Sequence, residues 1–253
     1  MSTSPPQQVP PCFVHSVRTI LQSRLKLPPE LASVIISIAQ YYARVTVHRR
    51  ESVTFRANEH YDPEIHDPAV AGLYMMSPPI PLPDAGSGEK FRIKSVTFMM
   101  TASDQGWASF GGNGTYHNSH TWFEASILWP VVNSEADVPL FANLRSDGSQ
   151  FTYTKALEAR EMFLDNGLQF KSAGDKNVVW KVHNNITAQS EPREYCVEWV
   201  AGGKVDLTEE KEGMEVGIGD GEGFIECLKP GDRIALWARA EVNEFYPVYP
   251  NCN

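Results

Sequence analysis

Cysteine is scarce in this sequence, and long apolar runs are missing. The 253 residues hold four cysteines, far apart and with no CxxC pair: Cys12, Cys196, Cys227 and Cys252. This spacing argues against a zinc knuckle or a thioredoxin-type site and is typical of reduced thiols. No apolar run approaches the roughly 20 residues that span a bilayer, and the opening residues lack the basic and apolar regions of a signal peptide. We therefore expect a cytoplasmic or nuclear protein without membrane attachment.

Positive charge is also in short supply. The chain has 22 Lys and Arg against 31 Asp and Glu, which gives a net charge of −9. An acidic balance argues against a broad surface for nucleic acid or for anionic membranes. The signatures of common enzymes are missing as well: there is no GxSxG elbow, phosphate loop or dinucleotide fingerprint, and the glycines of 217–224 stand among acidic residues that would repel phosphate. We expect no cofactor.

Strand-like patterns fill most of the chain. Alternating apolar and β-branched residues predict strands over 44–57, 91–102, 121–130, 178–186, 195–202 and 232–246. The proline-rich segment 58–88 is predicted to cross the sheet, with only 73–76 pairing as a short strand. Residues 155–164 fit either a short helix or a strand. Many strands without alternating helices predict an antiparallel β-sandwich over 44–253, of jelly-roll or galactose-binding-like type.

The amino-terminal part has a different character. Residues 1–12 are rich in Pro, Ser and Gln and are predicted to form a disordered tail. Residues 13–43 are predicted to form a helical segment of two short helices, with apolar residues at helical spacing in each. Pro28 and Pro29 suit the start of the second helix, where the helix dipole favours the acid Glu30.

The start of this second helix carries a resemblance. The run LPPEL at 27–31, followed by isoleucines at 35, 36 and 38, resembles the opening helix of an F-box. In that family the helix docks the adaptor subunit of cullin-type ubiquitin ligases through apolar side chains. The resemblance implies a partner-binding role for Leu27, Pro28, Leu31 and Ile35. The later helices of an F-box are missing from the sequence, and a helix that packs against the β domain is the alternative.

A dense polar and aromatic stretch lies between the strands predicted at 91–102 and 121–130. It reads SDQGWASFGGNGTYHNSHTWFE over 103–124, and we expect a long loop joining two paired strands, where binding groups collect. Aromatic rings can cover the apolar faces of sugars, and fixed amides or carboxylates can bind hydroxyls. The predicted site for a carbohydrate, peptide or small molecule comprises Asp104, Gln105, Trp107, Tyr116, His117, Ser119, His120, Trp122 and Glu124.

A second resemblance covers most of the chain, from about residue 27 to residue 240. The runs LYMMSPPIP, SDQGW, GTYHNSHTWFEASI and GEGFIECLKPGDRIALWARA are similar to those of a widespread fungal family without an established activity. In that family a comparable series often follows an F-box-like helix or is joined to other interaction modules. The resemblance implies a binding or adaptor protein, with the ubiquitin-ligase adaptor as a partner of the helix.

Other interpretations stay open at this stage. An enzyme acting on a small fungal metabolite would use Asp104, His117, His120 or Glu124 as acid, base or metal ligand, although we expect no metal site. Asp104 could instead cap the loop by accepting backbone N–H groups, as Asp before Gly often does in turns. The aromatic and polar residues would then only shape the domain, which would be a structural interaction domain without a small ligand.

Overall fold

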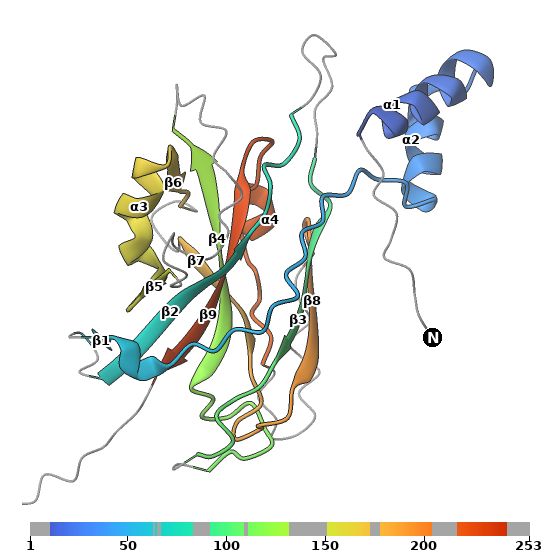
Figure 1. The fold of residues 1–253 in the computed structure, drawn as a ribbon. Coiled ribbons are helices and arrows are strands. Elements are labelled where there is room, and N and C mark those ends of the chain that lie inside the picture. Colours follow the sequence, from blue (N-terminus) through green and yellow to red (C-terminus); the bar gives the residue numbers. More distant parts are fainter. Residues whose placement is uncertain are drawn as a thin grey trace, which may run out of the picture. The chain divides into compact units, whose positions relative to one another are not determined.

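The computed structural model describes residues 11–62, 64, 67–82, 92–108, 111–131, 151–172, 178–203 and 217–241 (Figure 1). The chain divides into a helical unit, Met1–His48, and a β unit, Arg49–Asn253. Most of the predicted tail of residues 1–12 lies outside the described residues, and its last two residues begin the first helix. In the part of the chain that the structure describes, no helix is long and apolar enough to cross a membrane.

The helical unit contains the two predicted helices. α1 (Pro11–Thr19) continues into a π-helical stretch, η1 (Ile20–Arg24), and α2 spans Pro29–Ile38. Pro29 occupies the first turn of α2, where its missing N–H costs nothing, and Glu30 follows in the same turn. α2 buries only Ala32 and Ile36. The helices are therefore defined by local signals, while little apolar surface is removed from water.

Residues 49–56 do not form the strand predicted over 44–57, and neither do the residues before them. The segment instead packs on strand β2 (Asp67–Met76). The Arg49 guanidinium donates to the carbonyl of Tyr74 and lies 4.8 Å from the centre of its ring. The Phe55 ring fills the space beside Gly72, where an added Cβ would lie 1.9 Å from it. The strand prediction is wrong because this segment contacts the sheet through its side chains and its backbone does not pair with a strand.

The main sheet is antiparallel and curled (Figure 1). Its order is β1-β2-β9-β4-β6, with β5 added to β2 and β7 added to β4. β2 is longer than the short strand predicted at 73–76 because Pro68 lies opposite Tyr61, near the end of the pairing, where a missing donor is tolerated. The strand bounds are β1 Tyr61–Asp62, β4 Thr121–Pro130, β5 Thr152–Tyr153, β6 Leu168–Phe170, β7 Val179–Asn184 and β9 Arg233–Glu241.

The second sheet is a two-stranded ribbon of β3 (Ser95–Ala102) and β8 (Arg193–Val200). β3 and β4 therefore belong to different sheets, and the prediction that their loop joins two paired strands is wrong. Neighbours in sequence often pair in a sheet, but β3 finds its partner far along the chain. The broader prediction of a mainly antiparallel β fold with a short helical lead is confirmed.

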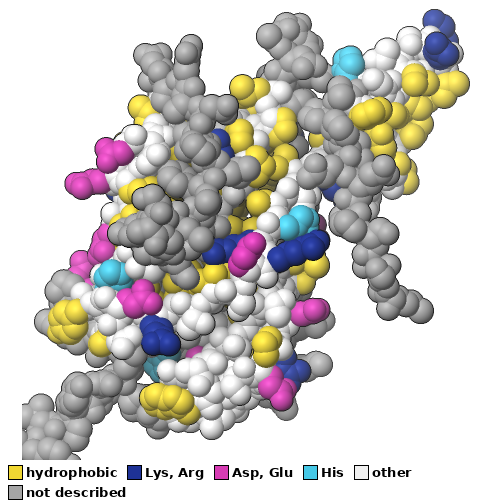
Figure 2. Space-filling model, viewed as in Figure 1, with side chains coloured by type: hydrophobic (Ala, Val, Ile, Leu, Met, Phe, Trp, Pro, Cys, Tyr) yellow, Lys and Arg dark blue, Asp and Glu magenta, His cyan; other side chains and the backbone are white. Residues whose placement is uncertain are grey.

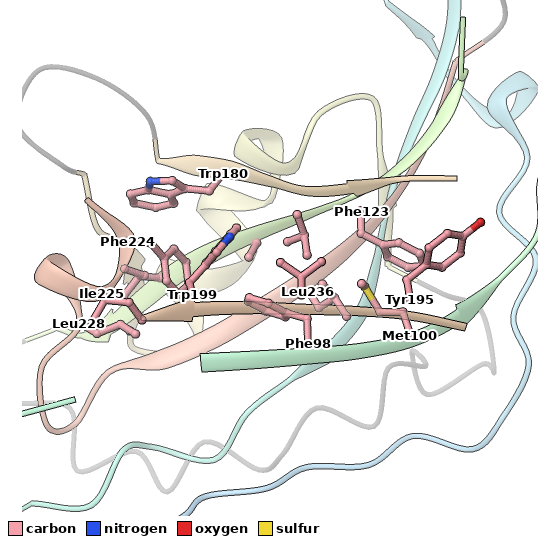
Figure 3. Close-up of a cluster of buried hydrophobic side chains, with 14 residues drawn as sticks. Phe98, Met100, Phe123, Trp180, Tyr195, Trp199, Phe224, Ile225, Leu228 and Leu236 are labelled. Carbon is pink, nitrogen blue, oxygen red and sulfur yellow. The ribbon is translucent and has the colours of Figure 1, made fainter. Parts of the chain in front are cut away.

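Two apolar cores cover the two faces of the main sheet. Between the sheet and the ribbon, α4 (Phe224–Cys227) inserts Phe224, whose ring centre lies 4.7 Å from that of Trp199 and 5.1 Å from that of Trp180 (Figure 3). The opposite face is covered by η3 (Ala156–Ala159) and α3 (Arg160–Asp165). There Phe163 packs against Trp237 of β9. Residues 155–164, whose sequence fits either a helix or a strand, are mostly helical, because in this form they cover the second core.

Candidate functional site

Asp104 anchors the start of the loop between β3 and β4. Its Oδ1 accepts a hydrogen bond from the Thr121 hydroxyl at 3.1 Å, and its Oδ2 accepts one from the Ala188 backbone N–H at 2.8 Å. The Asp104 N–H donates to the Gln189 carbonyl at 2.8 Å. The residue is 8% exposed. Both carboxylate oxygens thus serve the protein itself, as in the capping alternative, and Asp104 positions the loop.

The rest of the loop is tied to the turn after β7. The N–H of Gly114 donates to the Thr187 carbonyl at 2.9 Å, and the Thr187 N–H donates to the Thr115 carbonyl at 2.8 Å. The Thr187 hydroxyl donates to the His117 carbonyl at 2.6 Å. Gly112 has φ +83°, and an added Cβ would lie 2.4 Å from that same carbonyl. We call residues 104–108, 111–121 and 185–189 together the loop clasp, because these hydrogen bonds join them.

The loop clasp presents some predicted site residues on its surface. Trp107 is 60% exposed, and its carbonyl accepts from the Gln105 amide at 3.1 Å. His117 is exposed, whereas Tyr116 is half-buried with its ring centre 5.3 Å from that of His183. Burial lowers the pKa of His183, so this ring stays neutral under the loop. A large aromatic side chain held in water by an ordered loop is a common feature of recognition surfaces.

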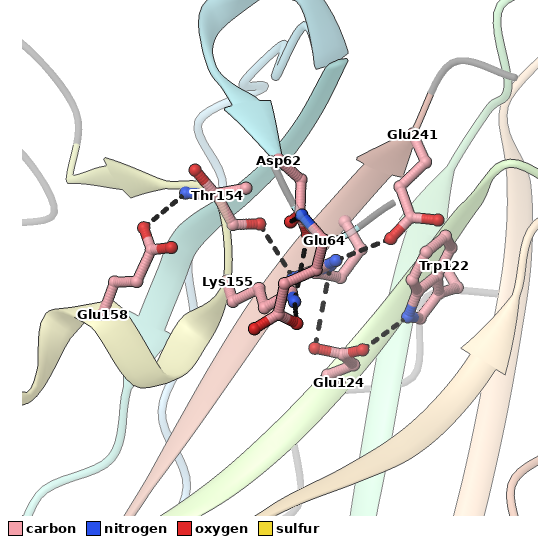
Figure 4. A network of polar contacts seen from close by, with 9 residues as sticks. Asp62, Glu64, Trp122, Glu124, Thr154, Lys155, Glu158 and Glu241 are labelled. Atoms are coloured by element: carbon pink, nitrogen blue, oxygen red, sulfur yellow. Dashed lines mark hydrogen bonds and ion pairs between the residues drawn. The ribbon is translucent and has the colours of Figure 1, made fainter. Parts of the chain in front are cut away.

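Trp122 and Glu124 lie on the opposite face of the sheet from Thr121. Successive residues of a strand point to opposite faces, and Phe123 enters the core under the ribbon. Trp122 stands opposite Arg239 of β9 in the register, and the guanidinium lies 5.2 Å from its ring centre. The Trp122 indole N–H donates to Glu124 Oε1 at 2.7 Å (Figure 4). β4 and β9 thus bring together an aromatic ring, an acidic side chain and a basic side chain.

Arg239 is the centre of this cluster. Its Nη2 donates to Glu241 Oε1 at 2.8 Å, its Nη1 to the Thr154 carbonyl at 3.1 Å, and its Nε lies 3.8 Å from Glu124 Oε2. Burial raises the pKa of Glu124 above its ordinary value, while the Arg239 charge and the Trp122 hydrogen bond act in the other direction. We call Trp122, Glu124, Arg239 and Glu241 the Arg239 cluster. The ion pair of Arg239 with Glu124 and its contact with the Trp122 ring join β9 to β4, while the side-chain hydrogen bonds of Trp122 and Glu241 each lie within one strand.

A second set of ion pairs, around Lys155, is also drawn in Figure 4. Lys155 pairs with Asp62 at 3.1 Å and with Glu64, and the Thr154 N–H donates to Glu158 at 3.0 Å (Figure 4). These contacts fasten β1 and the start of η3 to each other. Within the described residues, no three His, Cys, Asp or Glu side chains converge as metal ligands, so the structure does not bring His117, His120 and Glu124 together as such a group.

The structure divides the sequence-predicted site among three places. Asp104 and Ser119 are turned inward to the loop clasp, where the Ser119 hydroxyl donates to the Thr121 carbonyl at 2.8 Å. Gln105, Trp107 and His117 lie at its surface. The carbonyl of His120 accepts from the Glu241 N–H at 2.9 Å, which joins the clasp to the end of β9. Trp122 and Glu124 belong to the Arg239 cluster.

Sequence reasoning missed Arg239, Glu241, Asn185 and Thr187. Asn185 donates to the Thr121 hydroxyl at 2.9 Å and so completes the anchor of Asp104. One signal for Arg239 was available, because an arginine between apolar residues of a central strand needs a buried acid. Thr187 carried no comparable signal, since its partners are backbone groups of a distant loop.

The helical unit exposes the residues expected to bind a partner. Leu31 is 51% and Ile35 42% exposed, Pro28 is exposed and Leu27 is half-buried. Figure 2 shows hydrophobic side chains gathered on this unit. Its exposed large apolar residues are Phe13, Ile20, Leu25, Leu31, Val34, Ile35, Ile38 and Val45. Such a concentration is typical of a protein-interaction surface.

Comparisons of the chain with protein-family models, with curated proteins and with solved structures give no match. Two surfaces of the described residues are therefore the candidates for function. One is the apolar face of α2 in the helical unit. The other is the loop clasp of the β unit with its exposed Trp107.

Proposed function

We propose that the protein is a recognition adaptor. The helical unit docks the adaptor subunit of a ubiquitin ligase, and the β unit, acting as a sandwich-type recognition domain, binds a carbohydrate- or peptide-like ligand. The observation that carries the proposal is the exposed apolar face of α2, formed by Leu31, Val34, Ile35 and Ile38. These residues follow the LPPE sequence that resembles the start of an F-box helix.

The energetics of this face favour a partner. Burying a large aliphatic side chain contributes roughly 1.5 to 3 kcal/mol when it starts fully exposed, and these four are between 42% and 79% exposed. Association itself costs an estimated 4 to 15 kcal/mol or more. The α2 face alone therefore supports weak binding, and contacts from the exposed Phe13, Ile20 and Leu25 would strengthen it.

The loop clasp supports the second half of the proposal. A ligand that stacks on Trp107 would meet a surface whose backbone is already ordered by Asp104 and Thr187. Pre-ordering lowers the entropy lost on binding and so favours affinity. A glycan and peptide array probed with residues 1–253 would identify the ligand class, with Trp107→Ala as the variant that should lose the signal.

The decisive experiment is co-purification of the full chain with the ligase adaptor subunit. Leu31→Asp places a charge on the exposed apolar face and should abolish recovery of the subunit. Ser33→Asp is the matched control, because Ser33 is exposed on the same helix and its hydroxyl donates to the Pro29 carbonyl within that helix. Equal recovery with both variants, or no recovery with the unaltered chain, would contradict the docking proposal.

A further inference from the structure

The two units differ in the sign of their charge. Residues 1–48 contain four of the 22 Lys and Arg but only one of the 31 Asp and Glu, which gives a net charge of +3. The net charge of the whole chain is −9, so residues 49–253 carry a net charge of −12. The basic residues of the helical unit are Arg18, Arg24, Lys26 and Arg44, and its one acid is Glu30.

Two of these cations stand beside the apolar surface. Arg24, the last residue of η1, and Lys26, in the turn before α2, are exposed on either side of Leu25, which is 61% exposed. Lys26 has φ +56°, and the N–H of Leu27 donates to the Leu21 carbonyl at 3.1 Å, so the turn has a defined shape. Neither cation forms an ion pair with a described residue. Both charges are thus available to a partner.

We infer that the surface that receives the helical unit is an apolar groove of an acidic protein, with carboxylates on its border opposite Arg24 and Lys26. This inference rests on the proposed docking function and adds the chemistry of the partner. Apolar contacts are non-directional and supply affinity, whereas complementary charges speed association and fix the orientation of the two proteins. A basic partner would be repelled by Arg24 and Lys26 as it approached.

An acidic protein fits this surface better than an anionic membrane does. Interfacial helices present a polar face rich in Lys and Arg along their length. α2 has ten residues with no Lys or Arg, and its one charged residue is the acid Glu30. Arg24 and Lys26 stand together just before the helix, at the end of η1 and in the turn that follows it, which suits a contact at the edge of a groove.

The test measures association of the full chain with the purified ligase adaptor subunit from about 0.05 to about 0.5 M NaCl, a range over which screening of exposed charges increases severalfold. The double change Arg24→Glu with Lys26→Glu should slow association about tenfold or more at low salt and much less at high salt. Arg44→Glu is the control, because it reverses an exposed charge of the same unit outside this turn, and it should stay within about twofold of the unaltered chain.

The outcomes separate the inference from the docking proposal. If the adaptor binds the double variant as well as the unaltered chain at every salt concentration, docking stands and the acidic border is wrong. If Leu31→Asp leaves binding intact as well, both proposals fail. Vesicles of phosphatidylserine and phosphatidylcholine provide the alternative surface. Binding of the full chain to these vesicles, without binding to the adaptor subunit, would overturn the inference in favour of a membrane.

Discussion

The helical unit exposes most of its large apolar side chains, whereas the β unit buries most of its own. In the helical unit, α2 buries Ala32 and Ile36 and leaves its larger aliphatic side chains in water. The β unit closes a core on each face of its main sheet around Trp199, Phe224, Phe163 and Trp237. A short pair of helices has too much surface for its volume to bury what it carries. The difference shows that the apolar core of the described residues lies almost entirely in the β unit.

Tryptophan fluorescence can separate the two units in an experiment. All six tryptophans of the chain, at positions 107, 122, 129, 180, 199 and 237, belong to the β unit. An unfolding curve followed by this signal therefore reports the β unit alone. Helical circular dichroism, recorded in parallel, also contains the signal from α1 and α2.

The largest expected effect is loss of core packing in the β unit. Phe163→Ala removes a fully buried ring that packs against Phe170 and Trp237, and should lower the free energy of unfolding by about 3 to 5 kcal/mol. Ile38→Ala in the helical unit is the contrast, because this side chain is 79% exposed and should cost less than about 0.5 kcal/mol. Comparable losses in urea unfolding would show that the two units share one core.

The next effect concerns the anchor of the loop clasp. Asp104→Ala removes two hydrogen bonds to a buried carboxylate and leaves the Ala188 N–H without its acceptor, so it should cost about 2 to 4 kcal/mol. Gln105→Ala next to it serves as the control and should be nearly neutral, because Gln105 is exposed. Amide hydrogen exchange should rise at Gly114 and Thr187 in the Asp104 variant. Unchanged protection there would mean that the clasp holds without Asp104.

A smaller effect should appear as pH dependence. The pKa of Glu124 is raised above its ordinary value of 4.5, chiefly by burial, so the folded state binds this proton more tightly than the unfolded chain does. Glu124 therefore favours folding fully below about pH 4.5, and this contribution is lost as the pH rises through the folded value. Glu124→Gln should be more stable than the unaltered protein at pH 7, with the difference vanishing in acid. A less stable variant at pH 7 would show that pairing with Arg239 outweighs burial.

The smallest effect on stability is expected at Trp107. This side chain is 60% exposed, so Trp107→Ala should change the free energy of unfolding by less than about 0.5 kcal/mol while abolishing ligand binding. Thermal unfolding checks the predicted stability, and the glycan and peptide array checks the predicted loss of binding. A large loss of stability with binding retained would assign Trp107 to the core of the clasp and remove it from the recognition surface.

Period-two patterns allowed most strands to be predicted. β8 alternates because one of its faces is packed and the other is turned away from the core. β9 lies between the two cores and is buried along most of its length, so its strand signal is a nearly continuous apolar run. The strand prediction for residues 49–56 is wrong because Val53 and Phe55 have strand propensity, yet the Phe55 ring packs against Gly72 of β2 and the segment pairs with no strand. The pairing of β3 could not be predicted, because nothing local distinguishes its true partner β8 from its neighbour in sequence, β4.

The candidate site was predictable in composition but not in geometry. Trp122 and Phe123 are adjacent in β4 and lie on opposite faces of the sheet, as neighbouring residues of a strand do. Asp104 was grouped with Glu124, yet Thr121, which binds Asp104, points to the other side of β4. Only the register with β9, which places Arg239 opposite Trp122, shows where the acid group belongs.

The position of β9 has a consequence for how the protein is made. This strand, residues 233–241, lies between β2 and β4, whose residues are synthesised much earlier. During translation β2 and β4 must wait with unpaired edges until β9 leaves the ribosome, and such edges invite aggregation. A chain that stops before residue 233 would lose the middle of its sheet, so premature termination late in the message should yield a chaperone-bound product and not a shortened folded protein.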